Sequence, residues 1–258
     1  MKDIKVVVAT HKKYKMPNDK MYIPIHVGAY GKESIGFQRD DEGINISQKN
    51  TSFCELTGLY WAWKNLDVDY LGLAHYRRHF KGKNKSKNAF EKVLTNKEAD
   101  MLLSNVDILV TKKRKYYIEN IYDHYDHTLY IETLDTAREI ISRKYPSYIK
   151  SFDRCMKRTY MHAFNMFIMK KSKLDEYCEW LFDILFELEE ELKDKEYNTF
   201  HARYPGRVSE LLLDVWLEEK GYNYKEVPFI YMENINKLKK VTSFLKAKFF
   251  KEKYEGSF

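Results

Sequence analysis

The amino-acid sequence predicts an α/β fold with a mostly parallel central sheet. Short apolar segments rich in β-branched residues alternate with longer amphipathic segments, which is the pattern of strands alternating with helices. Residues 5–10 are apolar almost throughout, as strands of a parallel sheet are when helices cover both of its faces. Polar and cationic residues directly follow several predicted strands. In such sheets, ligands bind at the carboxyl ends of the strands.

The predicted strands are short, and polar residues or glycine follow them. The first strand contains the β-branched run Val6, Val7 and Val8, and Gly28 closes the second. The predicted strands are residues 5–10, 21–27, 70–74, 107–110, 165–169 and 227–232.

Four segments have the apolar spacing of amphipathic helices. They are residues 50–65, 134–143, 174–192 and 208–220, the last of which ends at Gly221. In the first helix, Thr51 or Ser52 is expected to cap the amino end, with Glu55 completing a capping box. Residues 31–46 and 81–88 are polar and are predicted to be loops.

Length and composition narrow the class of protein. A chain of 258 residues with 44% hydrophobic residues is long enough for a sizeable core and too apolar for a disordered chain. No apolar run approaches the roughly 20 residues of a membrane-spanning helix. The first residues lack the apolar stretch of a signal peptide, and three widely spaced cysteines fit a reducing compartment. We therefore expect a cytoplasmic protein.

The net charge of +7 comes mainly from the carboxyl-terminal tail. Residues 237–253 contain seven lysines and one acidic residue, a net charge of +6, so the rest of the chain carries only +1. Leu238, Val241, Leu245 and Phe249 lie at helical spacing in this tail. A basic amphipathic helix is typical of binding to an anionic membrane surface. The alternative is a helix that docks its apolar stripe on the protein core.

This distribution of charge predicts a domain over residues 1–235 and a tail over residues 236–258. A nucleic-acid-binding protein is expected to spread its positive charge over the fold. We therefore expect no nucleic-acid partner, and a peripheral location on the inner face of the cytoplasmic membrane.

The most informative segment follows the predicted strand 70–74. It delivers His75, Arg77 and Arg78 to the carboxyl end of that strand. Arginine offers planar, paired donors that match the oxygens of phosphate. The position therefore favours a phosphate-binding site, and the alternative interpretation is a cluster of surface ion pairs.

Other residues near strand ends and in the polar loop are candidates for binding a donor substrate. The loop residues can hydrogen-bond sugar or ribose hydroxyl groups, although a solvated loop and a helix cap also explain their presence. The donor-binding candidates are Thr10, His11, Lys12, Gly28, Asp41, Asn45, Asn50, Arg77 and Arg78.

Two motifs contain residues that can bind a metal. The position of the first and the small number of ligands in the second argue against a metal site. Asp67 and Asp69 have the spacing of metal-binding carboxylates, but they precede a strand and so should lie at the opposite end of the sheet from the arginines. His124 and His127 have no cysteine or third histidine at a ligand spacing. We expect no metal cofactor, because fixed cations would neutralise a diphosphate instead.

Four further residues are candidates for the acceptor side of a reaction. His162 and Asn165 precede or begin a predicted strand, where a lone histidine is more often structural. Arg207 and Glu210 lie at a turn into a helix. Glu210 is interpreted either as a first-turn carboxylate favoured by the helix dipole or as a general base.

Together these segments resemble the DUF4422 family of bacterial capsule, exopolysaccharide and O-antigen biosynthesis proteins. The resemblance extends over residues 3–235, and the family is linked to glycosyl transfer, including galactofuranosyl transfer. It rests on residues 45–50, 54–65, 70–80 and 165–169, on Arg207, and on Ser209 with Glu210.

The resemblance implies a GT-A-like fold with a nucleotide-binding half and an acceptor half. It implies a UDP-sugar donor and a glycan acceptor, often lipid-linked. In the mechanism we expect, Arg77 and Arg78, with His11 or Lys12, stabilise the departing UDP. An inverting transfer needs one base for the acceptor hydroxyl, for which Glu210 is the first candidate, before Glu55 and Asp41.

His75 completes the group of catalytic candidates, and His162, Asn165 and Arg207 form the acceptor-binding group. Glu55 has an alternative role as the buried partner of an arginine from the segment that follows strand 70–74. Two other functions compete with transfer: a phosphate- or nucleotide-binding module, and a non-catalytic scaffold of a polysaccharide assembly complex.

Overall fold

The computed structural model describes residues 2–233 and 253, which form two compact units. The first unit comprises Met1–Lys112, His162–Trp180 and Tyr222–Glu233. The second comprises Lys113–Met161, Leu181–Gly221 and Asn234–Phe258. The chain therefore crosses between the units several times. The predicted amphipathic tail lies outside the described residues except for Lys253, and so does the boundary at residue 235.

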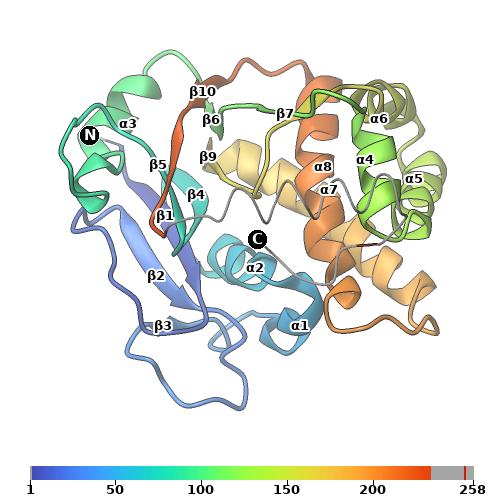
Figure 1. Cartoon of the computed structure of the whole chain (residues 1–258). Coiled ribbons are helices and arrows are strands. Elements are labelled where there is room, and N and C mark those ends of the chain that lie inside the picture. Colours follow the sequence, from blue (N-terminus) through green and yellow to red (C-terminus); the bar gives the residue numbers. More distant parts are fainter. Residues whose placement is uncertain (1, 234–252, 254–258) are drawn as a thin grey trace. The chain divides into compact units, whose positions relative to one another are not determined.

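The first unit is built on one mixed sheet, whose main path has the order β10-β6-β9-β4-β1-β2-β3. Its strands are β1 (Ile4–Thr10), β2 (Tyr22–His26), β3 (Gln38–Arg39), β4 (Tyr70–His75), β5 (Arg78–Phe80), β6 (Ile108–Thr111), β9 (Phe167–Lys170), β10 (Lys225–Val227) and β11 (Phe229–Tyr231). Along this path β9 is antiparallel to both of its neighbours, and every other pair is parallel. Figure 1 shows β1, β2 and β4 side by side. The predicted α/β fold with a mostly parallel sheet is confirmed.

The central strands are the apolar segments that the sequence predicts. Val6, Val7 and Val8 of β1 are fully buried, and β1 pairs with β4 over six residues. Gly72 of β4 lies so close to β9 that a Cβ atom there would stand 2.6 Å from the Phe167 carbonyl oxygen. Only glycine allows this approach of the two backbones.

The direction of β9 has a consequence for the position of Asn165. Leu73 of β4 pairs with Phe167 of β9 in the antiparallel register. Extending the register by two residues in each strand brings Asn165 level with His75. The start of β9 therefore lies at the carboxyl end of β4.

The helices of the first unit correct the prediction for residues 50–65. They are α1 (Asn50–Phe53), α2 (Leu56–Asn65), α3 (Asn96–Leu102) and the first half of α7 (Lys171–Glu191), with short 3-10 turns at Ser47–Lys49 and Phe90–Lys92. The predicted single helix is interrupted at Cys54, whose φ of 52° is incompatible with a right-handed helix.

The predicted capping box at the start of this helix is also wrong. Neither α1 nor α2 has a side-chain cap, and the Glu55 side chain bonds instead to Asn165. A capping box does occur at α3, where Thr95 and Glu98 exchange hydrogen bonds with each other's backbone N–H groups.

Two predicted strands have different bounds in the structure. The strand expected at 165–169 begins only at Phe167, because Phe164 and Asn165 have positive φ angles of 79° and 51°. The segment 227–232 divides at Pro228 into β10 and β11, since proline has no N–H for a continuous ladder. The predicted loop 31–46 contains the short strand β3.

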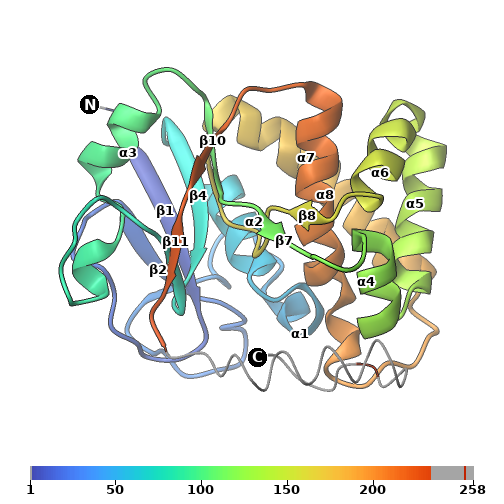
Figure 2. The ribbon, with the colours of Figure 1, turned by 45° about the horizontal axis from the view of Figure 1, so that its top comes forward.

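The second unit is mainly helical. It contains α4 (Ile121–Thr128), α5 (Glu132–Lys144), α6 (Ile149–Met156), the second half of α7, α8 (Tyr204–Lys220), the antiparallel pair of β7 (Arg114–Lys115) with β8 (Tyr160–Met161), and 3-10 turns at Pro146–Tyr148 and His201–Arg203. Figure 2 shows α4, α5 and α6 side by side, and α6 also contacts α8.

The start of α8 corrects the interpretation of Glu210. The helix begins at Tyr204 rather than at 208, with Pro205 in its first turn, where the missing N–H costs nothing. Its first turn contains no acidic residue, so Glu210 lies in the second turn and the helix dipole does not explain its position. Gly221 ends the helix in the left-handed conformation, as predicted.

No helix within residues 2–233 is both long and apolar enough to cross a membrane.

Candidate functional site

A buried carboxylate and an imidazole meet at the carboxyl edge of the first unit's sheet. The Glu55 Oε1 atom accepts a hydrogen bond of 2.8 Å from the Asn165 side-chain amide and lies 3.6 Å from the His75 Nε2 atom. The Glu55 side chain is 10% exposed and the His75 side chain 16%. Three distant segments, the start of α2, the end of β4 and the turn before β9, thus converge on one point.

The backbone around this cluster is unusual at two of its positions. Cys54, immediately before Glu55, has φ 52°, and Asn165 has φ 51°. Residues other than glycine adopt such angles at a cost, and they do so mostly where the surroundings enforce them, often at functional sites. The two turns place Glu55 and the Asn165 amide within hydrogen-bonding distance.

The cluster holds Glu55 in its ionised form. Burial alone raises the pKa of a carboxyl group, but the charge of His75 and the Asn165 amide outweigh it and lower the pKa of Glu55 to about 2. The His75 Nε2 atom is buried and makes no hydrogen bond, so its contact with Glu55 is electrostatic. At neutral pH the cluster therefore contains a permanent negative charge.

The two arginines that follow β4 have no acidic partner in the described part of the chain. The Arg78 guanidinium stacks 4.4 Å from the Phe164 ring centroid and 5.7 Å from that of Tyr231. The Arg77 guanidinium lies 5.4 Å from the Tyr76 ring. The Nε atoms of both arginines are buried without a hydrogen bond. Aromatic rings thus position the two cations and leave their charges available for an anion.

The end of β1 contributes to the same edge, because β1 and β4 are neighbours. Thr10 is buried, and its hydroxyl bonds to the carbonyl of Lys12, which shapes the turn. The Lys12 Nζ atom lies 5.2 Å from the Tyr76 ring and 3.9 Å from a carboxylate oxygen of Glu233. The exposed His11 ring packs edge-on against Tyr76. Tyr76 therefore contacts cations from both strands.

The structure shows that Asp40 organises the loop after β2, a role that sequence reasoning missed. This carboxylate is fully buried and accepts hydrogen bonds from four donors. The donors are the backbone N–H groups of Gly28 and Ala29 and the hydroxyls of Ser47 and Thr57, at 2.5–3.0 Å. A buried charge is tolerated only when it is hydrogen-bonded in this way. In the sequence, Asp40 is distinguished only as the first of three consecutive acidic residues.

Gly28 and Asn50 lie together, and their contacts are structural. Gly28 has φ +62°, and a Cβ atom there would stand 2.3 Å from the Asn50 Oδ1 atom. The Asn50 amide donates to the Cys54 carbonyl and to the Thr57 hydroxyl. Asn50 thereby braces the break between α1 and α2 that orients Glu55.

The remaining loop candidates are engaged locally. Both Asp41 oxygens accept hydrogen bonds from Arg39, at 2.9 and 2.6 Å, and this bonding lowers the pKa of Asp41. Asn45 closes a turn by bonding to Gly43 and Ser47. Neither residue lies in the Glu55 cluster.

His162 is in the core of the first unit. Its ring is 1% exposed, packs edge-on against Tyr224 and has its Nε2 atom 3.6 Å from Glu226. Of the predicted acceptor residues in this unit, Asn165 belongs to the Glu55 cluster and His162 packs against β10.

Two predicted residues lie in the second unit, both on α8. The Arg207 guanidinium stacks 3.9 Å from the Phe200 ring and donates to the Phe200 carbonyl. The carboxylate of Glu210 lies near Tyr116, whose pKa is raised mainly by burial and also by the charges of Glu210 and Glu119. Glu210 therefore lies near Tyr116, in the second turn of α8.

The histidines of α4 share one buried carboxylate. Glu119 accepts from the Nδ1 atoms of His124 and His127, at 2.6 and 3.0 Å. Burial lowers the pKa of His124 to about 4, against the opposing effect of Glu119, so His124 is neutral at pH 7.

Asp69 lies at the end of β4 that the sequence predicts for it. Asp69 lies at the amino end of β4, where its carboxylate accepts from the backbone N–H of Asp3. It is thus at the opposite end of the strand from His75. Nowhere in residues 2–233 do three His, Cys, Asp or Glu side chains gather in a way that would hold a metal ion.

A family model matches residues 5–221, which is most of the chain. The chain belongs to the DUF4422 family. That family is described as a domain of unknown function. No curated protein is significantly similar to this DUF4422 chain.

The DUF4422 chain is similar to one solved structure, that of the WbbM bifunctional glycosyltransferase in its apo form. The sequences are 30% identical, and the TM-score is 0.83. The similarity covers 90% of this chain and 46% of the WbbM chain, so the DUF4422 chain spans about half the length of that relative.

Proposed function

We propose that this protein is a glycosyltransferase that moves a sugar from a UDP-sugar to a glycan acceptor. One observation carries the proposal: 90% of the chain matches part of the WbbM bifunctional glycosyltransferase, with 30% identity and a TM-score of 0.83. The arrangement of charges at the carboxyl edge of the sheet supports it independently, because that edge is where α/β sheets bind their ligands.

The donor diphosphate would bind to Arg77 and Arg78. These cations have no carboxylate partner within the described residues and lie beside the ends of β1 and β4. Fixed guanidinium groups stabilise the negative charge that develops on the departing UDP. On this proposal the reaction needs no divalent metal.

Glu55 and Glu210 would have different roles in an inverting transfer. A general base works best when its pKa is near the working pH, and the pKa of Glu55, about 2, is far below it. Glu55 is therefore better suited to position His75, whose Nε2 atom lies 3.6 Å from the Glu55 Oε1 atom. Glu210, beside Tyr116, remains the first candidate to remove the proton of the acceptor hydroxyl.

The finer assignments follow from family resemblance and from the tail. We propose a galactose or galactofuranose donor, a lipid-linked acceptor, and a role in capsule, exopolysaccharide or O-antigen synthesis. The basic tail would hold the enzyme at the inner face of the cytoplasmic membrane.

The direct test is UDP release from a panel of UDP-sugars, with and without a lipid-linked oligosaccharide acceptor. We expect turnover with at least one UDP-hexose, unchanged by EDTA. Arg78→Gln should lower turnover by at least tenfold, because a bidentate phosphate contact is lost. Arg143→Gln removes an exposed arginine that pairs with Glu187 and Glu191 and serves as the matched control.

Two outcomes would contradict parts of this proposal. Loss of turnover in EDTA would show that a metal does the work assigned to the arginines. Near wild-type turnover of a folded Glu210→Gln protein would remove Glu210 from the mechanism. If the protein binds UDP but releases none from any UDP-sugar with acceptor present, the alternative of a non-catalytic nucleotide-binding scaffold is favoured.

A further inference from the structure

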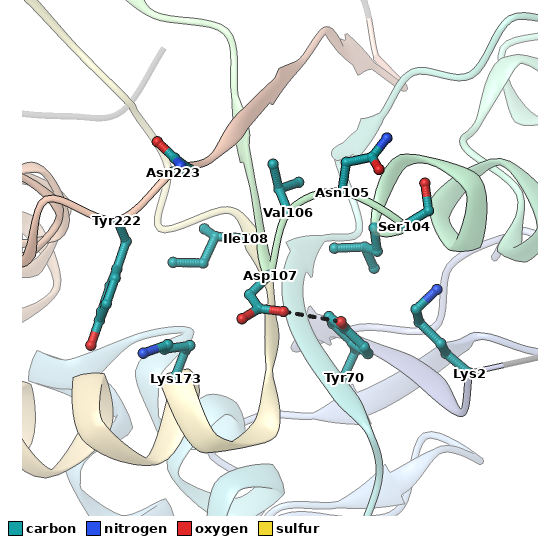
Figure 3. Close-up of a pocket in the computed structure, with 11 residues that line it drawn as sticks. Lys2, Tyr70, Ser104, Asn105, Val106, Asp107, Ile108, Lys173, Tyr222 and Asn223 are labelled. Carbon is teal, nitrogen blue, oxygen red and sulfur yellow. Dashed lines mark hydrogen bonds between the residues drawn. The ribbon is translucent and has the colours of Figure 1, made fainter.

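A hollow opens at the amino edge of the same sheet, away from the Glu55 cluster. Its volume is about 510 Å³, within the range of about 300–1,000 Å³ that is usual for small-molecule sites. It is bordered by the start of β4, the segment before β6, the start of α7 and the segment before β10 (Figure 3). All of these segments belong to the first unit.

This hollow is separate from the site proposed for the donor. Tyr70, which lines it, and His75 are the first and last residues of β4. A strand rises about 3.3 Å per residue, so five residues separate the two positions by roughly 16 Å. The two sites therefore lie at opposite ends of one strand.

Part of the lining of the hollow is apolar and aromatic. Ile108, Leu103 and the Tyr70 ring belong to this part and are buried. The Tyr222 side chain stands at one side in Figure 3, held by its hydroxyl bond of 2.8 Å to Glu176. The Lys173 Nζ atom lies 3.7 Å from the Tyr222 ring centroid.

Polar side chains that make few hydrogen bonds within the protein surround this apolar surface. The exposed side chains of Asn105 and Asn223 lie on the rim. The Asp107 carboxylate, between Tyr70 and Lys173 in Figure 3, accepts a long hydrogen bond of 3.4 Å from the Tyr70 hydroxyl and has its Oδ1 atom 3.9 Å from the Lys170 Nζ atom. These groups can accept and donate hydrogen bonds without first breaking strong internal ones.

The charges of the hollow do not favour an anion. The Lys2 ammonium is paired with the Asp100 carboxylate at 2.8 Å. The Asp107 carboxylate faces the same space and would repel a phosphate or a carboxylate. An uncharged ligand with several hydroxyl groups matches the polar groups that line the hollow. They are the Asp107 carboxylate, the amides of Asn105 and Asn223, and the Lys173 ammonium.

We propose that this hollow binds an uncharged saccharide ring. A sugar has one apolar face, which suits an aromatic surface, and hydroxyl groups at its rim, which suit carboxylate, amide and ammonium partners. The Asp107 carboxylate accepts from two ligand hydroxyls, the Asn223 amide bonds a third, and the Lys173 ammonium, which lies over the Tyr222 ring, donates to a fourth. The site holds a sugar unit away from the donor, and its existence does not depend on the transferase reaction.

The test is saturation-transfer NMR with methyl glycosides of galactose and glucose as probes, on the full chain. We expect a signal for at least one glycoside in the wild type. Asp107→Ala and Asn223→Ala should each weaken binding by about tenfold, the effect of losing hydrogen bonds to a charged group or several to an amide. The second variant changes only an exposed side chain and so keeps the test valid if the first fails to fold.

Two control variants separate this site from the rest of the unit. Asp67→Ala removes an exposed carboxylate on the segment leading into β4 that does not line the hollow. Arg78→Gln alters the proposed donor site and should leave glycoside binding unchanged while it weakens UDP binding.

Three results would overturn the proposal. The first is the absence of a glycoside signal in the wild type. The second is a glycoside signal in Asp107→Ala and Asn223→Ala equal to that of the wild type. The third is binding of inorganic phosphate that Asp107→Ala strengthens and that glycosides do not displace. A protein that binds glycosides here and releases no UDP from any UDP-sugar would keep this inference and reject the proposed function, so the two fail separately.

Discussion

Glu55 has a different role from the one its local sequence predicts. Its position three or four residues after Ser52 and Thr51 is typical of a helix cap, yet its carboxylate bonds to Asn165, 110 positions away. Burial raises the pKa of a carboxyl group, and here the charge of His75 and the Asn165 amide lower it to about 2. The ionisation of Glu55 therefore makes the stability of the fold depend on pH, and Glu55 is also part of the proposed site.

Glu55→Gln should remove an acid-sensitive part of the stability. The pKa of Glu55 is about 2 in the folded protein and 4.5 ordinarily, so the stabilisation is present above pH 4.5 and lost as the pH falls towards 2. The difference corresponds to about 3 kcal/mol. Urea unfolding between pH 7 and pH 3 measures it.

In Glu55→Gln, we expect a lower free energy of unfolding at pH 7 and a smaller loss on acidification. Glu33→Gln is the matched control, because Glu33 is exposed. Equal acid sensitivity in wild type and Glu55→Gln would contradict the ionised state assigned to Glu55.

His79 should make the protein less stable in mild acid. This residue is fully buried, neither ring nitrogen has a hydrogen-bond partner, and burial, with a smaller effect of His75, lowers the pKa of His79 to about 3. The unfolded chain binds a proton below pH 6.5 and the folded chain does not. The free energy of unfolding should therefore fall by about 2 kcal/mol between pH 8 and pH 5.

Replacing His79 by leucine should remove this dependence, as thermal or urea unfolding at the two pH values would show. His11→Gln alters an exposed histidine and should retain the wild-type slope. An unchanged slope in His79→Leu would mean that His79 binds a proton equally well in the folded and the unfolded chain.

At the scale of the elements, the break between α1 and α2 is the feature that shapes the proposed site. The apolar spacing continues across it, because Phe53, Leu56 and Leu59 are all fully buried. The backbone nevertheless turns at Cys54, with φ 52° and ψ −126°, a region that favours glycine. Asn50 and Thr57 hold the turn through side-chain hydrogen bonds.

Cys54→Gly should stabilise the protein by about 1 kcal/mol, because glycine adopts this conformation without strain. Cys54→Val should destabilise it by at least as much, since a β-branched side chain tolerates positive φ poorly. Chemical unfolding at neutral pH measures both. Cys54→Ala separates the thiol from the strain: it keeps the Cβ atom, so stabilisation by alanine equal to that by glycine would refute the role of strain.

At the scale of the whole molecule, the positive charge divides into two parts. Arg77 and Arg78 lie at the carboxyl edge of the sheet without an acidic partner among residues 2–233, whereas most of the net charge is in residues 237–253. Lys253 is described, and its ammonium donates to the carbonyls of Asp126 and Leu129 and lies 5.2 Å from the Tyr130 ring. This lysine satisfies carbonyl groups at the end of α4, as cations commonly do at helix carboxyl ends.

The tail should determine binding to anionic membranes. Deleting residues 237–258 should reduce co-sedimentation with phosphatidylglycerol vesicles by at least tenfold, because each lysine near such a surface contributes about 1 kcal/mol. Binding to neutral phosphatidylcholine vesicles should be weak with or without the tail.

A second variant keeps the contact of Lys253 with α4. Replacing Lys237, Lys239, Lys240, Lys246 and Lys248 by glutamine removes most of the tail charge and should weaken vesicle binding similarly. If both proteins sediment like the wild type, the alternative holds, in which the tail docks on the protein core.

The sequence by itself determined the class of fold, most of its strands and the ends of several helices. These features depend on local chemistry: β-branched apolar runs form buried strands, and Gly221 ends α8 because glycine adopts the left-handed angles required there. The order of residues along β4 also sufficed to place Arg77 and Arg78 at the carboxyl edge and Asp69 at the amino edge. Family membership follows from the same local segments.

Only the tertiary structure decided which side chains meet. The antiparallel direction of β9 brings Asn165 level with His75, and the turn at Cys54 directs Glu55 towards both. Four donors from separate segments converge on Asp40. Hydrogen bonds between residues far apart in the chain decide the direction of a strand, the positive φ angle of one residue and whether a charge can be buried. The local pattern of apolar residues does not predict which residues form those hydrogen bonds.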